Sequence, residues 1–187
     1  MTENERRIVD AAKGLFLKFG YAKVTIGEVA KASGVSRPTV YQSFANKDEV
    51  FLGILEDFNR VSFEKIERVL EEGGSFVEMA GGIFQIWTIE PYVMLSQSEE
   101  AAEFVNCKFP FAQEAFDAAY AQIERYLEQA LEKSGVSLSG IGMSTSQLAH
   151  LLTSTMRGLK SSAKNREDLE SMVGQWLSVV ETANEVT

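Results

Sequence analysis

The chain has 187 residues, 45% of them hydrophobic, so it is long enough and apolar enough to bury a real core. No run approaches the ~18 consecutive apolar residues of a membrane span, and the N-terminus has no signal-peptide pattern, so we expect a cytoplasmic protein with no membrane partner. The single Cys107 permits no internal disulfide, and we expect it to be a small packed side chain. We expect no metal site and no cofactor.

The charge of the chain is unevenly distributed. The formal net charge is -9, yet residues 1–47 hold eight Lys and Arg against four acids and carry +4. Residues 48–187 therefore carry -13. A basic head on an acidic body attracts phosphate at one end and repels nucleic acid from the other, which favours a defined docking orientation on DNA.

The first predicted helix runs to about Phe19, with Gly20 as its C-terminal stop. Its apolar residues recur at spacings of three and four on one face: Ile8, Ala12, Leu15, Phe16 and Phe19. Thr25 stands three residues before Glu28, which is capping-box spacing and predicts that a second helix starts there.

A short third helix follows a break at Ser33-Gly34. Ser36 is its expected N-cap and Pro38 lies in its first turn, where a missing N–H costs little. This helix closes near Phe44. Two short helices joined by a glycine turn, with polar and basic groups at the start of the second, predict a helix-turn-helix.

The rest of the chain is predicted to be helical as well. Asn46 caps a fourth helix of about twenty residues that links head and body. Pro91 and Pro110 are expected to interrupt the chain, and residues 134–144 form a Gly- and Ser-rich loop. Further helices are expected over 76–89, 92–106, 111–133, 145–164 and 167–184. The predicted fold is all-α, with a three-helix helix-turn-helix domain over 1–47 and a larger ligand-binding and dimerisation domain over 48–187.

The start of the third helix carries the candidate base-reading residues. Arg37 offers a two-pronged donor suited to guanine, which is worth about 1–3 kcal/mol of base discrimination when used in this way. Thr39, Pro38 and Gln42 suit hydroxyl, apolar and amide contacts to bases. Four further residues are better suited to contact phosphates: Thr25, Tyr41, Ser43 and Lys47. Phosphate contacts position the protein on DNA without reading the base sequence. Each residue alone also has an ordinary structural explanation as a cap or a solvated surface group.

The first 50 residues resemble the TetR family of bacterial one-component transcriptional regulators. The resemblance rests on Gly20-Tyr21, Thr25-Ile26, Val29-Ala30, Ser33-Gly34-Val35-Ser36, Val40-Tyr41, Phe44 and Lys47. It implies a homodimer, commonly a repressor, whose C-terminal domain binds a small inducer and releases the operator. It places on operator-contacting positions Ser36, Arg37, Pro38, Thr39, Tyr41, Gln42, Ser43 and Lys47. Pro38 and Gln42-Ser43 depart from the residues usual in the family, so the operator sequence does not carry over.

The body has one candidate interface and one candidate pocket. The stripes of the last two helices suggest a four-helix dimer interface that includes Leu152, Met156, Leu159, Met172, Trp176 and Val180, although they also suit the chain's own core. An aromatic and Met-rich stretch suggests a pocket for an apolar or aromatic effector, lined by Phe84, Trp87, Met94, Phe104, Phe109, Phe116 and Tyr120. Such side chains more often form plain core than the wall of a pocket.

Three functions remain open at this stage. The first is a ligand-released repressor on a near-palindromic operator. The second is a TetR-like activator, or a regulator that answers a protein partner. The third is a helical enzyme, which is disfavoured because the chain has one His, one Cys and no phosphate-binding Gly-rich loop. We predict no catalytic residues.

Overall fold

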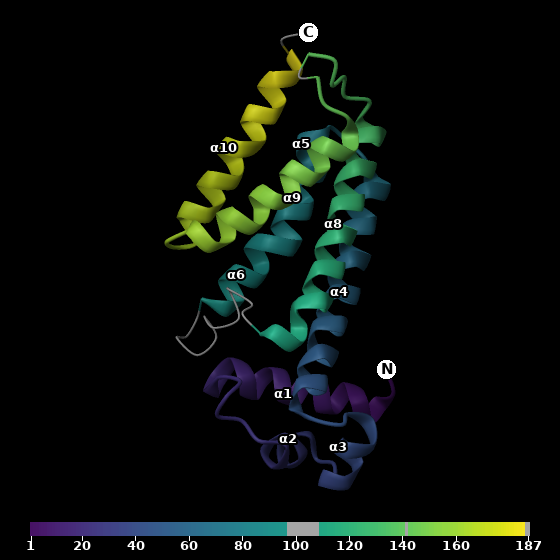
Figure 1. Ribbon diagram of the computed structural model, residues 1–187, viewed down its shortest axis with the longest axis vertical. Coiled ribbons are helices and arrows are strands. Elements are labelled where there is room, and N and C mark those ends of the chain that lie inside the picture. Colours follow the sequence, from purple (N-terminus) through teal and green to yellow (C-terminus); the bar gives the residue numbers. More distant parts are fainter. Residues whose placement is uncertain (97–108, 141, 186–187) are drawn as a thin grey trace. The chain divides into compact units, whose positions relative to one another are not determined.

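The structure is a computed structural model that describes residues 1–96, 109–140 and 142–185 (Figure 1). Every regular element in these ranges is helical and none is a strand, which confirms the predicted all-α class. No helix of the described chain is long and apolar enough to cross a membrane. Contacts divide the chain into two compact units, one of residues 1–60 and 94–116 and the other of residues 61–93 and 117–187.

The first unit begins with the three predicted short helices. These are α1 (Glu3–Phe19), α2 (Ile26–Ser33) and α3 (Arg37–Ser43), followed by the start of α4 (Lys47–Glu72). Local capping sets their bounds: the side chains of Thr2, Thr25 and Ser36 each accept a hydrogen bond from the backbone N–H three residues on. Gly34 ends α2 with a φ of 67°, in the left-handed region that favours glycine.

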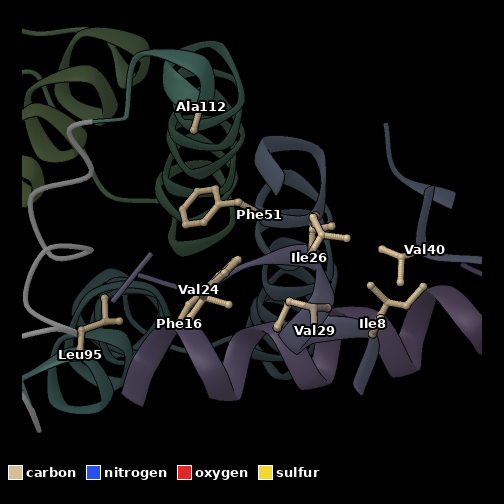
Figure 2. Close-up of a cluster of buried hydrophobic side chains, with 12 residues drawn as sticks. Ile8, Phe16, Val24, Ile26, Val29, Val40, Phe51, Leu95 and Ala112 are labelled. Carbon is tan, nitrogen blue, oxygen red and sulfur yellow. The ribbon is translucent and has the colours of Figure 1, made fainter. Parts of the chain in front are cut away.

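The core of this unit joins the helices to a later part of the chain (Figure 2). Ile8 and Phe16 of α1, Val29 of α2 and Val40 of α3 are all almost fully buried in one cluster. Phe51 of α4 joins the same cluster, as do Leu95 and Ala112. Because α3 contributes Val40 with no exposed surface, this core fixes the rotation of α3 about its own axis.

The second unit is built from the remaining helices. Its elements are α4 from residue 61 on, α5 (Phe76–Phe84), a π-helical turn (Gln85–Ile89), α6 (Glu90–Leu95) up to residue 93, α8 (Gln113–Ser134) from residue 117 on, α9 (Thr145–Ser162) and α10 (Arg166–Glu185). A 3-10 turn (Pro110–Ala112) precedes α8 and belongs to the first unit. The helices α9 and α10 form an antiparallel pair, and α10 also packs on α5 (Figure 1).

Pro91 does not interrupt the helical path, contrary to the sequence prediction. The backbone stays helical from Phe76 to Leu95, through the π turn that precedes Pro91. Within that turn the N–H of Glu90 donates to the carbonyl of Gln85, five residues back. A π turn shifts the carbonyls out of α-helical register, which relieves the clash and the missing hydrogen bond that proline causes in a regular helix.

The contact units and the predicted domains have different boundaries, and one predicted helix is described only in part. The expected domain boundary at 47/48 falls at the start of α4, whereas the two contact units meet within that uninterrupted helix, at residues 60 and 61. Only the start of the expected 92–106 helix, to Leu95, lies among the described residues.

Candidate nucleic-acid interface

The third helix presents one face to solvent and buries the other. Arg37, Pro38, Tyr41 and Gln42 are exposed, while Val40 is fully buried in the core beneath them. Thr39 and Ser43 are half-buried at the edges of the exposed face. The sequence prediction therefore grouped residues that the structure does bring together on one short helix.

Arg37 is held in place by its neighbour one turn along. Its Nη2 donates to the Tyr41 hydroxyl at 3.3 Å, and the guanidinium carbon lies 5.6 Å from the centre of the Tyr41 ring. Contact with an aromatic ring restricts the long arginine side chain while leaving other donors available. The arrangement presents a partly ordered guanidinium at the start of α3.

The caps beside α3 are engaged with their own helices. The Thr25 hydroxyl accepts from the backbone N–H of Glu28 at 3.3 Å, and the Glu28 carboxylate accepts from the Thr25 N–H at 2.8 Å. These backbone and hydroxyl bonds from Thr25 lower the pKa of Glu28 below its ordinary value. Ser36 accepts from the Thr39 N–H at 3.2 Å in the same way. Both predicted contact residues thus also serve as N-caps.

Lys47 occupies a different environment from the one its sequence position suggests. It is half-buried, and its Nζ donates to the carbonyls of Tyr21 at 2.8 Å, Val24 at 3.0 Å and Ala22 at 3.4 Å. The same ammonium lies 4.3 Å from the centre of the Tyr21 ring. Its three donors are therefore directed at backbone carbonyls.

Tyr21 is an important residue that the sequence reasoning did not single out as functional. Its hydroxyl donates to the Asp48 carboxylate, and burial together with this bond raises the pKa of Tyr21. Its ring packs against Phe16, Phe51, Phe109 and Phe111 at centroid distances of 5.1 to 5.7 Å. The signal available in the sequence was its place directly after the helix-ending Gly20.

The predicted pocket residues do not gather in one place. Met94, Phe109 and Phe116 pack against the core of the first unit. Phe84 and Trp87 are buried in the second unit, and Tyr120 is half-buried there. Phe104 lies outside the described residues.

The aromatic contacts around the π turn fall into two groups. The Trp87 ring lies on the Phe63 ring at 5.5 Å with an interplanar angle of 21°, and it meets the Tyr120 ring edge-on at 6.1 Å. Phe84, directly before the π turn, packs against Trp176 of α10 at 5.5 Å. Trp87 of the π turn thus contacts two aromatic rings of other helices.

Tyr120 also borders a cleft of about 270 Å³ between α8 and α9. An ion pair crosses the cleft from Arg157 to Asp117 at 3.2 Å, and Nδ1 of His150 lies at hydrogen-bond distance, 3.1 Å, from the Glu124 carboxylate. The Arg157 guanidinium lies 3.9 Å from the centre of the Tyr120 ring. Polar side chains of α8 and α9 thus partner one another across the cleft.

Among the described residues, a buried threonine hydroxyl in the π turn makes no hydrogen bond, unlike two threonine hydroxyls of α9. Thr88 is fully buried, and within the described structure its Oγ1 has no hydrogen-bond partner. Thr153 and Thr155, in the regular helix α9, each donate to the carbonyl four residues back at 2.9 and 2.8 Å. The altered carbonyl register of a π turn explains why Thr88 makes no such bond.

The predicted interface residues separate into two groups. Leu152 and Met156 have 0 and 1% exposed surface in the single chain and Val180 has 9%, so these three belong to the chain's own core. Side chains this deeply buried in the single chain have almost no surface left to bury against a partner, and the interface stays a prediction. Leu159, Met172 and Trp176 are half-buried.

Residues 8–54 match the family model of bacterial regulatory proteins of the tetR family. This match covers the helix-turn-helix head of the chain. Among relatives, the HTH-type transcriptional regulator YerO of Bacillus subtilis is 32% identical over 72 residues, which are 38% of this chain and 25% of that protein. AcrR of Shigella flexneri is 39% identical over 54 residues, 29% of this chain and 25% of AcrR. These alignments span only about a quarter of the length of either relative.

Solved structures share the fold of this chain over nearly its whole length. A transcriptional regulator from Rhodococcus sp. Rha1 has a TM-score of 0.74 and 21% identity over 100% of both chains. The fatty acid degradation regulator FadR from Bacillus halodurans has a TM-score of 0.69 and 18% identity over 95% of each chain. At these identities the likeness shows a shared fold.

Proposed function

We propose that this chain is a homodimeric, DNA-binding transcriptional regulator of the TetR family that a small apolar or aromatic effector releases from a near-palindromic operator. The observation that carries the proposal is α3, which exposes Arg37, Tyr41 and Gln42 on one face while Val40 anchors the other. A positively charged head built around such a helix suits the major groove. A DNA target places the regulator in the cytoplasm.

Each exposed group has a proposed role toward the operator. Arg37 reads a guanine through its free donors, and Pro38, Thr39 and Gln42 contact bases beside it. Thr25, Ser36, Tyr41 and Ser43 contact phosphates, which fixes the orientation of the head without reading sequence. Lys47 is left out of the phosphate-contacting set, because its ammonium already donates to three carbonyls.

The proposed dimer interface uses the exposed faces of α9 and α10. Leu151 is 49% exposed and Val179 is 68% exposed, which is high for aliphatic side chains of this size. Gly158 and Gly174 have open space where a Cβ would lie, so a partner helix can approach closely there. The half-buried Trp176 adds aromatic surface. A two-fold dimer of this kind sets its recognition helices about 34–36 Å apart, one turn of DNA.

The effector site is proposed at the π turn of the second unit. An unpaired buried hydroxyl costs about 1–3 kcal/mol, and π turns occur frequently at functional sites. Thr88 supplies the hydroxyl, while Phe84 and Trp87 supply apolar surface. This combination supports an aromatic or apolar effector with one hydrogen-bonding group. A fold neighbour, SmeT, was solved as a complex with triclosan (TM-score 0.65, 21% identity).

A second candidate function is transcriptional activation, which the similarity to one relative supports. The transcriptional activator FasR of Mycolicibacterium smegmatis is 36% identical over 58 residues, 30% of this chain and 26% of FasR. The head of an activator and that of a repressor hold DNA in the same way, so the site geometry supports both signs of regulation.

Footprinting on DNA that flanks the protein's own gene tests the proposal. The expected result is a protected, near-palindromic segment whose protection is lost with one member of a panel of apolar, aromatic and cationic compounds. Transcription from the same template, with and without that compound, then separates repressor from activator. Absence of protection on this DNA and on random duplexes alike would reject DNA binding. Protection that no compound relieves would reject the effector part alone.

A further inference from the structure

Two cations from neighbouring helices hold the two ends of α2. At the N-terminal end, Lys47 of α4 donates to carbonyls of the segment that leads into the Thr25 cap. At the C-terminal end, Nη2 of Arg7 from α1 donates to the carbonyl of Ser33 at 2.8 Å and to that of Gly34 at 3.4 Å. The first helix of the helix-turn-helix is therefore tied to α1 at its C-terminal end and, through the segment that precedes it, to α4.

The charges suit these positions. The last carbonyls of a helix lack partners within the helix and carry partial negative charge, which a guanidinium neutralises. Lys47 lies against three carbonyls and the face of the Tyr21 ring, all of which attract an ammonium ion. Hydrogen bonds to charged groups are stronger than neutral ones, so each cation fixes its end of α2 firmly.

Gly34 makes room for this arrangement. A Cβ at this position would lie 2.7 Å from Nη2 of Arg7, which is too close for the arginine to keep its place. The positive φ of Gly34 also turns the chain into α3. One glycine thus provides both the turn and the space for Arg7.

We infer that Arg7 and Lys47 are positioning residues for DNA recognition: they fix α2, and through the Gly34 turn they fix the pose of α3. The inference rests on the proposed DNA-binding function. Its distinctive consequence is that loss of either cation loosens the helix pair while the number of phosphates that the head neutralises stays the same.

Salt titration of DNA binding separates positioning from direct phosphate contact. Lys47→Met and Arg7→Met keep an unbranched side chain without its donors, and each should weaken binding to a duplex bound by the wild type about tenfold at fixed salt. The slope of log K against log salt should equal that of the wild type. A slope shallower by ~0.9 would mean that the cation contacts a phosphate and would overturn the inference for that residue.

Conservative variants and a matched control complete the titration. Lys47→Arg and Arg7→Lys keep a charged donor and should restore most of the lost affinity; failure of both to do so would count against the role. Lys31→Met removes the same charge from an exposed site on α2 and should change affinity much less than Lys47→Met. Equal losses in the two variants would attribute the effect to net charge and overturn the inference.

Amide hydrogen exchange provides a readout without DNA. The Val29 N–H donates to the Thr25 carbonyl at 3.1 Å, and the Val35 N–H donates to the Ala30 carbonyl at 3.2 Å, at opposite ends of α2. Lys47→Met should speed exchange at Val29, and Arg7→Met at Val35, by about tenfold. Unchanged rates would overturn the inference. If either Met variant fails to fold, its conservative variant is measured instead. The exchange rates of that variant should match those of the wild type, and faster exchange would overturn the inference. Faster exchange in a protein that binds no duplex would instead reject the proposed function.

Discussion

A buried hydroxyl of the head, that of Ser33, and one of the second unit, that of Thr88, differ in their hydrogen bonding. In the head, Ser33 is 6% exposed and its Oγ donates to the carbonyls of Val29 at 2.7 Å and Ala30 at 3.1 Å. In the second unit, Thr88 is equally buried and bonds to nothing in the described structure. A buried group with all its hydrogen bonds made favours one geometry. A buried hydroxyl without a partner carries a desolvation penalty, which a ligand that bonds to it would remove. The difference suits a DNA-binding head of fixed geometry and a second unit whose structure responds to a ligand.

The largest expected effect concerns the core of the second unit. Phe84 has no exposed surface and packs on Trp176, so Phe84→Ala should lower the free energy of unfolding by about 3–5 kcal/mol. Chemical denaturation measures the loss. Val61→Ala, at a 38% exposed position of the same unit, should cost under about 1 kcal/mol. Similar losses in the two variants would contradict the assigned core.

The next effect concerns base reading by the head. Arg37→Ala should reduce discrimination at one base pair by about 1–3 kcal/mol, because the guanidinium at the start of α3 is the proposed guanine reader. Binding-site selection with wild type and variant measures it. An identical consensus from both proteins would remove Arg37 from the set of reading residues.

A pair of threonine substitutions within the second unit tests whether the Thr88 hydroxyl lacks a hydrogen bond. Thr88→Val should stabilise the effector-free protein by about 1 kcal/mol, because it removes an unpaired buried hydroxyl. Thr153→Val should destabilise it by about 1 kcal/mol, because the Thr153 hydroxyl donates to Ala149. Thermal melts report both changes. Destabilisation by both variants would show that Thr88 is bonded after all.

The smallest expected effect is a pH dependence in the head. The bonds to Thr25 hold the pKa of Glu28 below its ordinary value of 4.5, so the stabilisation by the carboxylate is present above that pH. It should disappear as the pH falls below 4.5 and Glu28 is protonated. Glu28→Gln should lose this part of the pH dependence in denaturation curves. Parallel curves for wild type and variant would contradict the capping role.

Much of the head could be predicted from the sequence because its signals are local. Thr25, Ser36 and Gly34 end or begin helices through bonds within a few residues, and the structure places those bounds where the sequence indicated. The charge of Lys47 was equally visible, but its carbonyl partners lie 23 to 26 residues away in the chain. Only the packing of α4 against the segment before α2 reveals them.

The body was harder to predict because identical side chains suit several tertiary settings. Phe84 and Phe109 looked alike as pocket residues, yet they lie in different units of the structure. Leu152 and Leu151 are neighbours on one helix, and only packing decides that the first is core and the second is exposed. Pro91 predicted a break in the helix. The π turn that accommodates this proline has no recognisable local pattern in the sequence, so the continuous helical path could not be predicted.

Selection of binding sites from a random duplex library tests the central claim most directly. A two-fold dimer should enrich two inverted half-sites whose centres lie one helical turn apart, about 10–10.5 base pairs. A selected pool that binds the protein no better than random duplex would contradict it.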